Sequence, residues 1–305
     1  QIFSIAQVKS GNGFLQVGRL LMPLMNQIET GSKRGTYVTG IPTGFTRLDR
    51  MTAGLQPGEL TVIGGRPSMG KSSYALNIAE HLALEQSVSV AIFSLEMSKE
   101  QVAQRLLCSV SRVDSSRVRT GMLADSDWPK LTAAAGKLSE APIFIDDAST
   151  LTILSMRARA RRLMAERKIG LFVVDYLQLM EGGQRSDSRQ EEIAQISRGL
   201  KAMARELHVP VLVLSQLSRL VENRTPPRPQ LSDLRESGAI ESDADVVLLL
   251  YRPGYYRRKE TEPDEEEDNT TEVIVAKQRQ GPTGTAYLAF LRQFTRFEEQ
   301  ERERK

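Results

Sequence analysis

A glycine-bounded segment contains residue types that suit binding of a triphosphate. The segment from Gly65 to Ser72 reads GRPSMGKS, and it lies between an apolar run and a run with helical periodicity. Glycines let backbone amides turn toward phosphate oxygens, and the positive end of the following helix attracts anions. At this spacing Lys71 reaches the β- and γ-phosphates and the Ser72 hydroxyl binds Mg²⁺. The sequence therefore predicts a site for a nucleoside triphosphate and Mg²⁺, which is formed by Ser68, Met69, Gly70, Lys71, Ser72 and Ser73.

Three polar residues follow apolar runs and are candidates for the chemistry on that triphosphate. Asp175 closes a very apolar run, where a carboxylate can hold the magnesium shell; the structural alternative is a helix cap. Glu96 ends another run and can act as general base toward the attacking water, or simply place a negative charge near the next helix. Gln216 follows a third run and is either a sensor of the γ-phosphate or a polar strand end.

The elements that must position these residues alternate along the chain. Strand-like runs are at 60–64, 87–95, 143–145, 171–175, 209–215 and 246–251, and helix-like runs at 72–84, 101–110, 152–167 and 191–207. Such alternation predicts an α/β fold with a mainly parallel twisted sheet flanked by helices. Two later runs, 272–276 and 285–291, predict antiparallel C-terminal strands. Ligands of such sheets bind beyond the carboxyl ends of the strands.

The two ends of the chain differ from this middle part. Apolar residues between Phe14 and Glu29 recur at helical spacing, and Pro23 is expected to kink or break that helix. Residues 31–40 predict a loop. The helix either packs against its own domain or against a neighbouring subunit. We therefore divide the chain into a linker helix with a flexible link at 1–40, an ATPase domain at 41–297 and a charged, frayed tail at 298–305.

Composition excludes several classes of protein. The chain has 305 residues, 40% of them hydrophobic and 26% charged, which suffices for a sizeable core. No apolar run approaches the roughly 20 residues of a membrane span, and no secretory signal is present, so we expect a cytoplasmic protein without membrane association. Cys108 is the only cysteine and is expected in the core; with His81 and His208 far apart, no zinc cluster is predicted. A net charge of +3 neither indicates nor excludes a polyanionic partner. Because the chain begins with Gln1, we expect a fragment of a longer protein.

Several segments in a fixed order resemble the C-terminal motor domain of DnaB-type replicative helicases. They are GIPTGF from Gly40, the Lys71 segment, FSLEMS from Phe93, DYLQL from Asp175, SQLSR from Ser215 and RESG from Arg235. The resemblance covers the chain from about Phe14 to its end. It implies a RecA-like P-loop NTPase fold. It also implies a homo-hexameric ring that encircles one strand of DNA, moves 5′ to 3′ along it with ATP as fuel, and unwinds duplex DNA.

The resemblance also implies roles for particular residues. Arg105 matches an arginine at the nucleotide site, while Lys277 and Arg279 match a pair of cations that enters the ATP site of the neighbouring subunit. Such cations stabilise the charge that develops on the γ-phosphate. The loops 182–189 and 219–238 match loops that face a central channel. The matching DNA-binding residues are Arg235, Glu236 and Gly238.

Other interpretations stay open at this point. A RecA- or RadA-like recombination ATPase would share the fold and bind single-stranded DNA as an open filament, and a nucleotide-dependent scaffold would not translocate at all. The family implies a helicase loader as partner, and a primase through an N-terminal domain that this sequence lacks. Finally, the arginines between 157 and 162 form either a second nucleic-acid patch or an ordinary solvated helix face.

Overall fold

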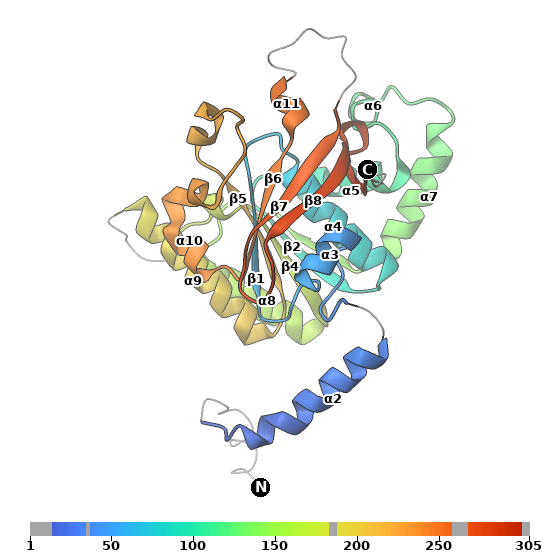
Figure 1. Cartoon of the computed structure of the whole chain (residues 1–305). Coiled ribbons are helices and arrows are strands. Elements are labelled where there is room, and N and C mark those ends of the chain that lie inside the picture. The colour runs from blue at the N-terminus through green and yellow to red at the C-terminus, as the bar shows by residue number, and fades with distance from the viewer. Residues whose placement is uncertain (1–13, 35–36, 183–187, 258–267, 301–305) are drawn as a thin grey trace.

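The computed structural model describes residues 14–34, 37–182, 188–257 and 268–300, and it contains one mixed sheet between two layers of helices (Figure 1). The strands lie in the order β3-β2-β4-β5-β1-β6-β7-β8-β9. The first six in chain order pair in parallel, and the last three are antiparallel. The strands are β1 Leu60–Gly65, β2 Ser89–Ser94, β3 Ile143–Asp146, β4 Ile169–Asp175, β5 Val211–Gln216, β6 Val246–Tyr251, β7 Thr270–Gln278, β8 Gly284–Leu291 and β9 Arg296–Glu299.

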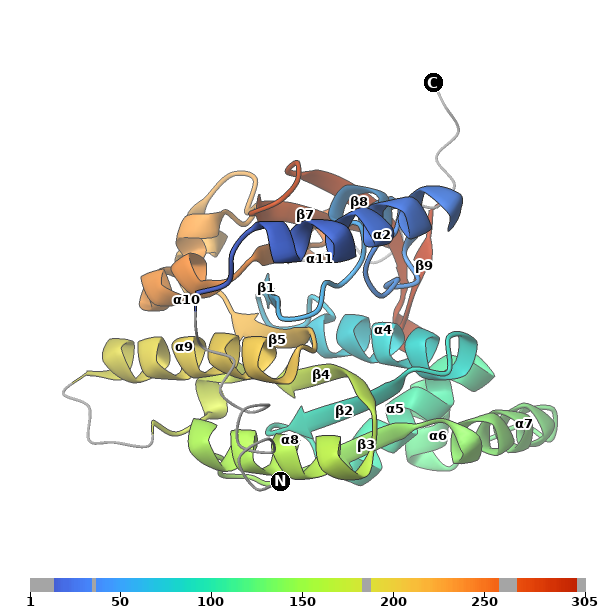
Figure 2. The same cartoon turned by 90° about the horizontal axis from the view of Figure 1, so that it is seen from below.

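The helices connect successive parallel strands and cover both faces of the sheet. Figure 2 shows α4 and α8 on opposite sides of β2 and β4. The α-helices are α2 Gly18–Arg34, α3 Thr46–Thr52, α4 Lys71–Glu85, α5 Lys99–Ser111, α6 Ser115–Thr120, α7 Asp127–Glu140, α8 Ile153–Glu166, α9 Arg189–Leu207, α10 Gly238–Asp243 and α11 Pro253–Arg257. Short 3₁₀ helices are η1 Leu177–Leu179, η2 Arg219–Asn223, η3 Leu231–Ser237 and η4 Arg292–Phe294.

Each parallel strand sends alternate side chains into two hydrophobic layers. In β4, Phe172 and Val174 pack in the layer of α8 and α9, whereas Leu171 and Val173 pack in the layer of α4 and α5. A strand buried on both faces is apolar throughout, which explains the uninterrupted runs in the sequence. The predicted α/β fold with antiparallel C-terminal strands is therefore confirmed. Cys108 lies buried in α5, as expected, and burial raises the pKa of its thiol to about 11.

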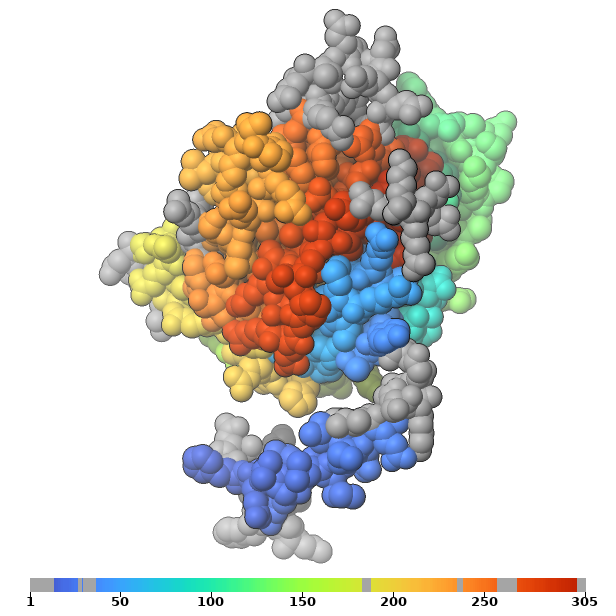
Figure 3. All heavy atoms as spheres, viewed as in Figure 1, coloured from blue at the N-terminus to red at the C-terminus, as the bar shows by residue number. Residues whose placement is uncertain are grey.

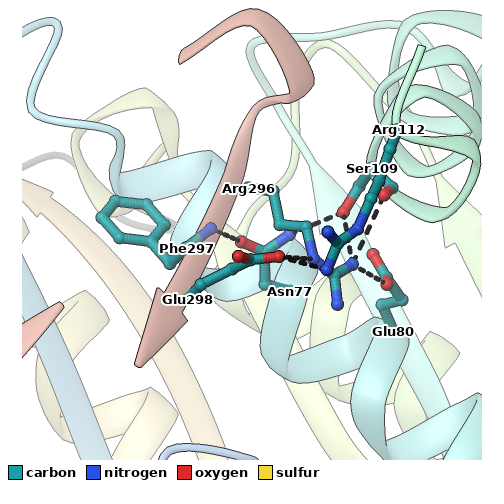
Figure 4. Close-up of polar contacts among 7 residues, drawn as sticks. All are labelled: Asn77, Glu80, Ser109, Arg112, Arg296, Phe297 and Glu298. Atoms are coloured by element: carbon teal, nitrogen blue, oxygen red, sulfur yellow. Dashed lines mark hydrogen bonds and ion pairs between the residues drawn. The ribbon is translucent and has the colours of Figure 1, made fainter. Parts of the chain in front are cut away.

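Strand β9 is an element that the sequence did not predict. Its residues bind the helices beneath it: Arg296 forms an ion pair with Glu80 of α4 at 2.6 Å, and the Phe297 amide donates to Asn77 at 2.7 Å (Figure 4). Glu298 pairs with Arg112 at 2.5 Å. The predicted frayed tail from residue 298 thus begins inside a strand. Pairing with β8, burial of Phe297 and ion pairs to distant elements order this segment, although the sequence from residue 298 is charged and polar.

Helix α2 lies apart from the sheet domain, and Figure 3 shows a gap between them on this face. The helix continues through Pro23, so the predicted break is not found, and it extends to Arg34, so residues 31–34 are helical rather than loop. Pro23 is the sixth residue of the helix, and its missing N–H removes one backbone hydrogen bond without ending the helix. The apolar side chains of this segment are half or more exposed, among them Val17, Leu20, Leu21 and Met25.

Candidate functional site

The predicted phosphate loop connects β1 to α4 at the carboxyl edge of the parallel strands. Gly70 has a φ of 91° immediately before α4, and a Cβ at this residue would lie 2.9 Å from a ring carbon of Phe297. Both the backbone conformation and the available space therefore require glycine. The loop turns tightly into the amino-terminal end of α4, the end of a helix that attracts phosphate.

The other predicted nucleotide-binding residues of the loop differ in exposure. Ser68 is exposed and adopts a positive φ of 66°. Met69 and Ser73 are buried, with only 1% and 5% of their surface exposed, so their side chains pack in the protein. These two residues can therefore offer a phosphate only their backbone amides.

Lys71 places a positive charge in this loop. Its ammonium donates to the carbonyl of Arg66 at 3.2 Å. Burial lowers the pKa of Lys71 to about 8, although the nearby carboxylates of Asp175 and Glu96 act in the opposite direction. A half-buried cation beside the phosphate loop can bind an anion.

Asp175 lies at the end of β4, directly beside the start of α4. The Ser72 hydroxyl lies close enough to its carboxylate to lower the pKa of Asp175. Burial raises the pKa of Asp175, and the charge of Glu96 raises it further, while Lys71 and Arg105 lower it. Asp175 is not a helix cap, because the following η1 is preceded by Tyr176 and has no side-chain cap. A carboxylate and a hydroxyl beside a phosphate loop are oxygen ligands that Mg²⁺ accepts, since Mg²⁺ takes few protein ligands and completes its shell with phosphate and water.

Glu96 is exposed just beyond the end of β2, the neighbour of β4 in the sheet. Its charge acts on both Lys71 and Asp175, so it lies on the same edge. The start of α5 is capped by Ser98 and Gln101, which form a reciprocal capping box. Other residues therefore already cap that helix, and Glu96 is not needed as a charge for its start.

Gln216 is the last residue of β5 and pairs in register with Gly65 at the start of the phosphate loop. The exposed side chain of Gln216 is thus next to the site rather than remote from it. Arg105 projects from α5 and is close enough to Asp175 to lower its pKa. The tertiary structure therefore gathers Lys71, Ser72, Glu96, Arg105, Asp175 and Gln216 at one edge of the sheet.

Sequence reasoning missed two residues of this region. Arg66 is buried and donates to the Leu217 carbonyl and to Glu222, both at 2.9 Å, which ties the phosphate loop to the segment after β5. Gln178 bridges the ends of β4 and β5. No periodicity or spacing marks either residue, since their partners, which include the side chains of Glu222 and Ser215, lie far along the chain.

Lys277 and Arg279 lie on the opposite edge of the sheet. Strand β7 runs antiparallel to β6, so its last residues pair with the first residues of β6. Lys277 donates to the Glu241 carbonyl, and Arg279 donates to the Ser242 carbonyl at 2.5 Å. Neither side chain can therefore reach the phosphate loop of its own chain.

The predicted DNA-binding residues lie at the junction of η3 and α10. Arg235 and Glu236 belong to η3, and their side chains are outside the part of the chain that the structure describes. Gly238 is the first residue of α10 and is exposed. Of the other predicted loop, 182–189, residues 183–187 lie outside the described residues.

The arginines of α8 have partners within the chain. Arg157 and Arg161 both pair with Glu206 of α9, and Arg159 pairs with Asp146 at 2.7 Å. Arg162 pairs with Glu166, four residues along the same helix, at 3.2 Å. These pairs favour the ordinary helix face over a second nucleic-acid patch.

Comparison with known proteins gives the family. The model of the DnaB-like helicase C-terminal domain matches residues 40–299. The chain belongs to this family. It is 48% identical over 303 residues to the replicative DNA helicase DnaB of Geobacillus stearothermophilus, and 49% identical over 302 residues to the replicative DNA helicase DnaC of Bacillus subtilis. Each alignment covers 99% of this chain but only 66% and 65% of those proteins, so the chain spans just under two thirds of their length.

Solved structures of the DnaB-like family agree with this assignment. The ATPase domain of G40P superposes with a TM-score of 0.87 at 40% identity, covering 95% of this chain and all of that one. A DnaB-like replicative helicase, described with its interactions with primase, superposes with a TM-score of 0.84 at 38% identity, covering 98% of this chain and 70% of that one. Membership of the DnaB-like family rather than of the recombination ATPases follows. Among the described helices, none is long and apolar enough to cross a membrane.

Proposed function

We propose that this domain is an ATP-hydrolysing helicase motor that assembles as a homo-hexameric ring, moves 5′ to 3′ on single-stranded DNA and unwinds duplex DNA. The observation that carries the proposal is the gathering of Lys71, Ser72, Glu96 and Asp175 beside the phosphate loop of a DnaB-like domain. Each of these side chains suits one part of phosphoryl transfer to water.

The roles follow from chemistry and position. Backbone amides of residues 68–73 and the Lys71 ammonium hold the β- and γ-phosphates of ATP. The oxygens of Ser72 and Asp175 hold Mg²⁺, which neutralises charge on the phosphates when it is bound. Glu96, exposed at the edge of the site, accepts a proton from the attacking water. Gln216 senses whether a γ-phosphate is present, and Arg105 adds positive charge to the nucleotide site.

Lys277 and Arg279 act on the ATP of a neighbouring subunit. Their location on the edge opposite to their own phosphate loop supports this role, because a cation there is remote from the ATP of its own subunit. Cations supplied in this way stabilise charge that develops on the γ-phosphate. Hydrolysis then depends on assembly of the ring.

Helix α2 supports the ring in the same proposal. Its exposed apolar side chains have no cover from the domain that follows, and exposed apolar faces of this kind are typical of protein contacts. We infer that the neighbouring subunit covers them, which is the second of the two interpretations that the sequence left open.

The DNA strand binds at Arg235, Glu236 and Gly238. A cation with exposed backbone amides at the start of α10 suits contacts to phosphates, which hold any sequence equally well and therefore suit a motor that translocates. Binding of this kind weakens as the salt concentration rises.

Further partners belong to the longer protein. One structural relative is described with its interactions with primase. We propose that primase and a helicase loader act on the complete protein that contains this domain, and that it works in the cytoplasm.

ATP hydrolysis and unwinding test the proposal directly. Wild type and Lys71→Ala are compared with and without single-stranded DNA, and unwinding of a forked duplex is measured in parallel. The proposal requires hydrolysis that DNA stimulates, unwinding that needs ATP, and loss of both in Lys71→Ala. Hydrolysis that is indifferent to DNA and to Lys71 would refute it.

A further inference from the structure

The side chain of Gln178 occupies an unusual position between two strand ends. Its amide nitrogen donates to the Ser215 hydroxyl at 3.0 Å and to the Gln216 carbonyl at 3.2 Å, and its amide oxygen accepts from the Gln216 backbone N–H at 3.2 Å. Gln178 itself belongs to η1, which follows β4. All three contacts thus join the β4 side of the site to the last residues of β5.

These contacts connect the β4 side to β5 beyond the last residues that pair as strands. Strands β4 and β5 pair only as far as Val174 and Val213, because β4 turns away at Asp175. Gln216 keeps Gly65 as its partner on the other side. At the end of β5 the Gln216 backbone has an N–H and a C=O that β4 does not pair, and the Gln178 carboxamide offers an acceptor to the first and a donor to the second. Gln178 therefore holds the backbone of Gln216 against the phosphate loop.

The backbone of Gln178 is connected to the loop 182–189. Arg189, the first residue of α9, donates to the Gln178 carbonyl at 2.5 Å and pairs with Glu192. Glu192 in turn accepts from the Gly182 amide at 2.6 Å. Both described ends of the loop are thus tied to η1, and the Gln178 side chain connects η1 to Gln216.

We propose that Gln178 is a positioning residue for hydrolysis: it holds Gln216 in place and links it, through Arg189 and Glu192, to the two described ends of the loop 182–189. The inference rests on the proposed function, in which Gln216 senses the γ-phosphate, and on the family resemblance, which implies that this loop faces the central channel. In this proposal Gln178 does not contact the nucleotide itself. Its removal should therefore change the turnover rate and its dependence on DNA while binding of ATP stays the same.

The test compares Gln178→Leu and Gln178→Glu with wild type. Leu removes all three hydrogen bonds, whereas Glu keeps the shape and the acceptor but loses the donor that faces the Gln216 carbonyl. We expect both variants to lower kcat for ATP in the presence of single-stranded DNA by about 10-fold or more, since small misplacements of a group at a reacting centre have effects of this size. KM for ATP should stay within about 2-fold, and the ratio of DNA-stimulated to basal hydrolysis should fall toward one.

Gln56→Leu is the matched control. Gln56 also makes three hydrogen bonds through its side-chain nitrogen, to Thr39, Ala53 and Gly54, but it precedes β1 on the other edge of the sheet. Thermal unfolding of all variants shows whether they are folded. If Gln56→Leu loses stimulation to the same degree as Gln178→Leu, the effect is one of general stability and the inference is wrong.

Two results separate this inference from the proposed function. If wild type shows no stimulation by DNA, the proposed function itself fails. If wild type is stimulated and Gln178→Leu and Gln178→Glu retain the same stimulation ratio and kcat, only the inference about Gln178 is overturned.

Discussion

The lysine of the phosphate loop should destabilise the domain when no nucleotide is bound. The pKa of Lys71 falls from 10.5 to about 8 because burial disfavours its charge. That difference corresponds to about 3 kcal/mol of free energy that the folded state loses by keeping the ammonium charged. Lys71→Met keeps most of the aliphatic chain and removes the charge. Because the variant also removes a cation near Asp175 and Glu96, we expect a net increase in the free energy of unfolding of about 1–3 kcal/mol.

The sign of this effect gives it a characteristic pH dependence. Below about pH 8 the lysine is charged in both the folded and the unfolded wild type, so the variant has its full advantage. Between about pH 8 and 10.5 the folded lysine loses its proton before the unfolded one does, so the wild type gains stability relative to the variant. The advantage should therefore shrink through this range and vanish above it.

Urea unfolding at several pH values, without nucleotide, measures this prediction. Lys137→Met, at an exposed position of α7, serves as control and should change the free energy of unfolding by less than about 0.5 kcal/mol. Addition of ATP and Mg²⁺ at about 100 times the dissociation constant should stabilise the wild type by about 2.7 kcal/mol and leave Lys71→Met unchanged. A variant that is less stable than wild type at pH 7 would refute the argument from burial of charge.

Three further predictions concern hydrolysis and the opposite edge of the sheet. Glu96→Gln should lower kcat by about 10²–10⁴-fold while nucleotide binding persists, which turnover assays and nucleotide titration measure; unchanged kcat excludes the general base. Rings with a Lys277→Met, Arg279→Met double variant should hydrolyse ATP slowly. Mixing this variant with Glu96→Gln should restore some activity, because mixed rings contain interfaces with an intact Glu96 facing intact cations, and a mixture that stays inactive speaks against action across subunits. Asp245→Ala should reduce the free energy of unfolding by about 3–5 kcal/mol in urea, since buried Asp245 accepts from Lys201 at 2.6 Å and pairs with Arg279; a loss below about 1 kcal/mol contradicts this.

Much of the architecture was predictable because each parallel strand carries its own signal. Strands buried on both faces must be apolar throughout, so β1, β4 and β6 were evident with nearly their observed bounds. Strand β9 gave no such signal. Arg296 pairs with Glu80 of α4, and Glu298 pairs with Arg112 directly after α5; such ion pairs leave no local pattern in the sequence.

Residue type and spacing alone were enough to locate the phosphate loop, the carboxylates after the strands and the polar end of β5. Parallel strands bring their carboxyl ends to one edge, which is why residues as distant as Lys71, Glu96, Asp175 and Gln216 could be assigned to one site. Only the tertiary structure decided that Lys277 and Arg279 lie on the other edge, since a single antiparallel strand reverses direction and carries them away from the phosphate loop. Only the tertiary structure also showed the contact between Gln178 and Gln216. That contact depends on where β4 leaves the sheet, which is a matter of packing and cannot be predicted from spacing in the chain.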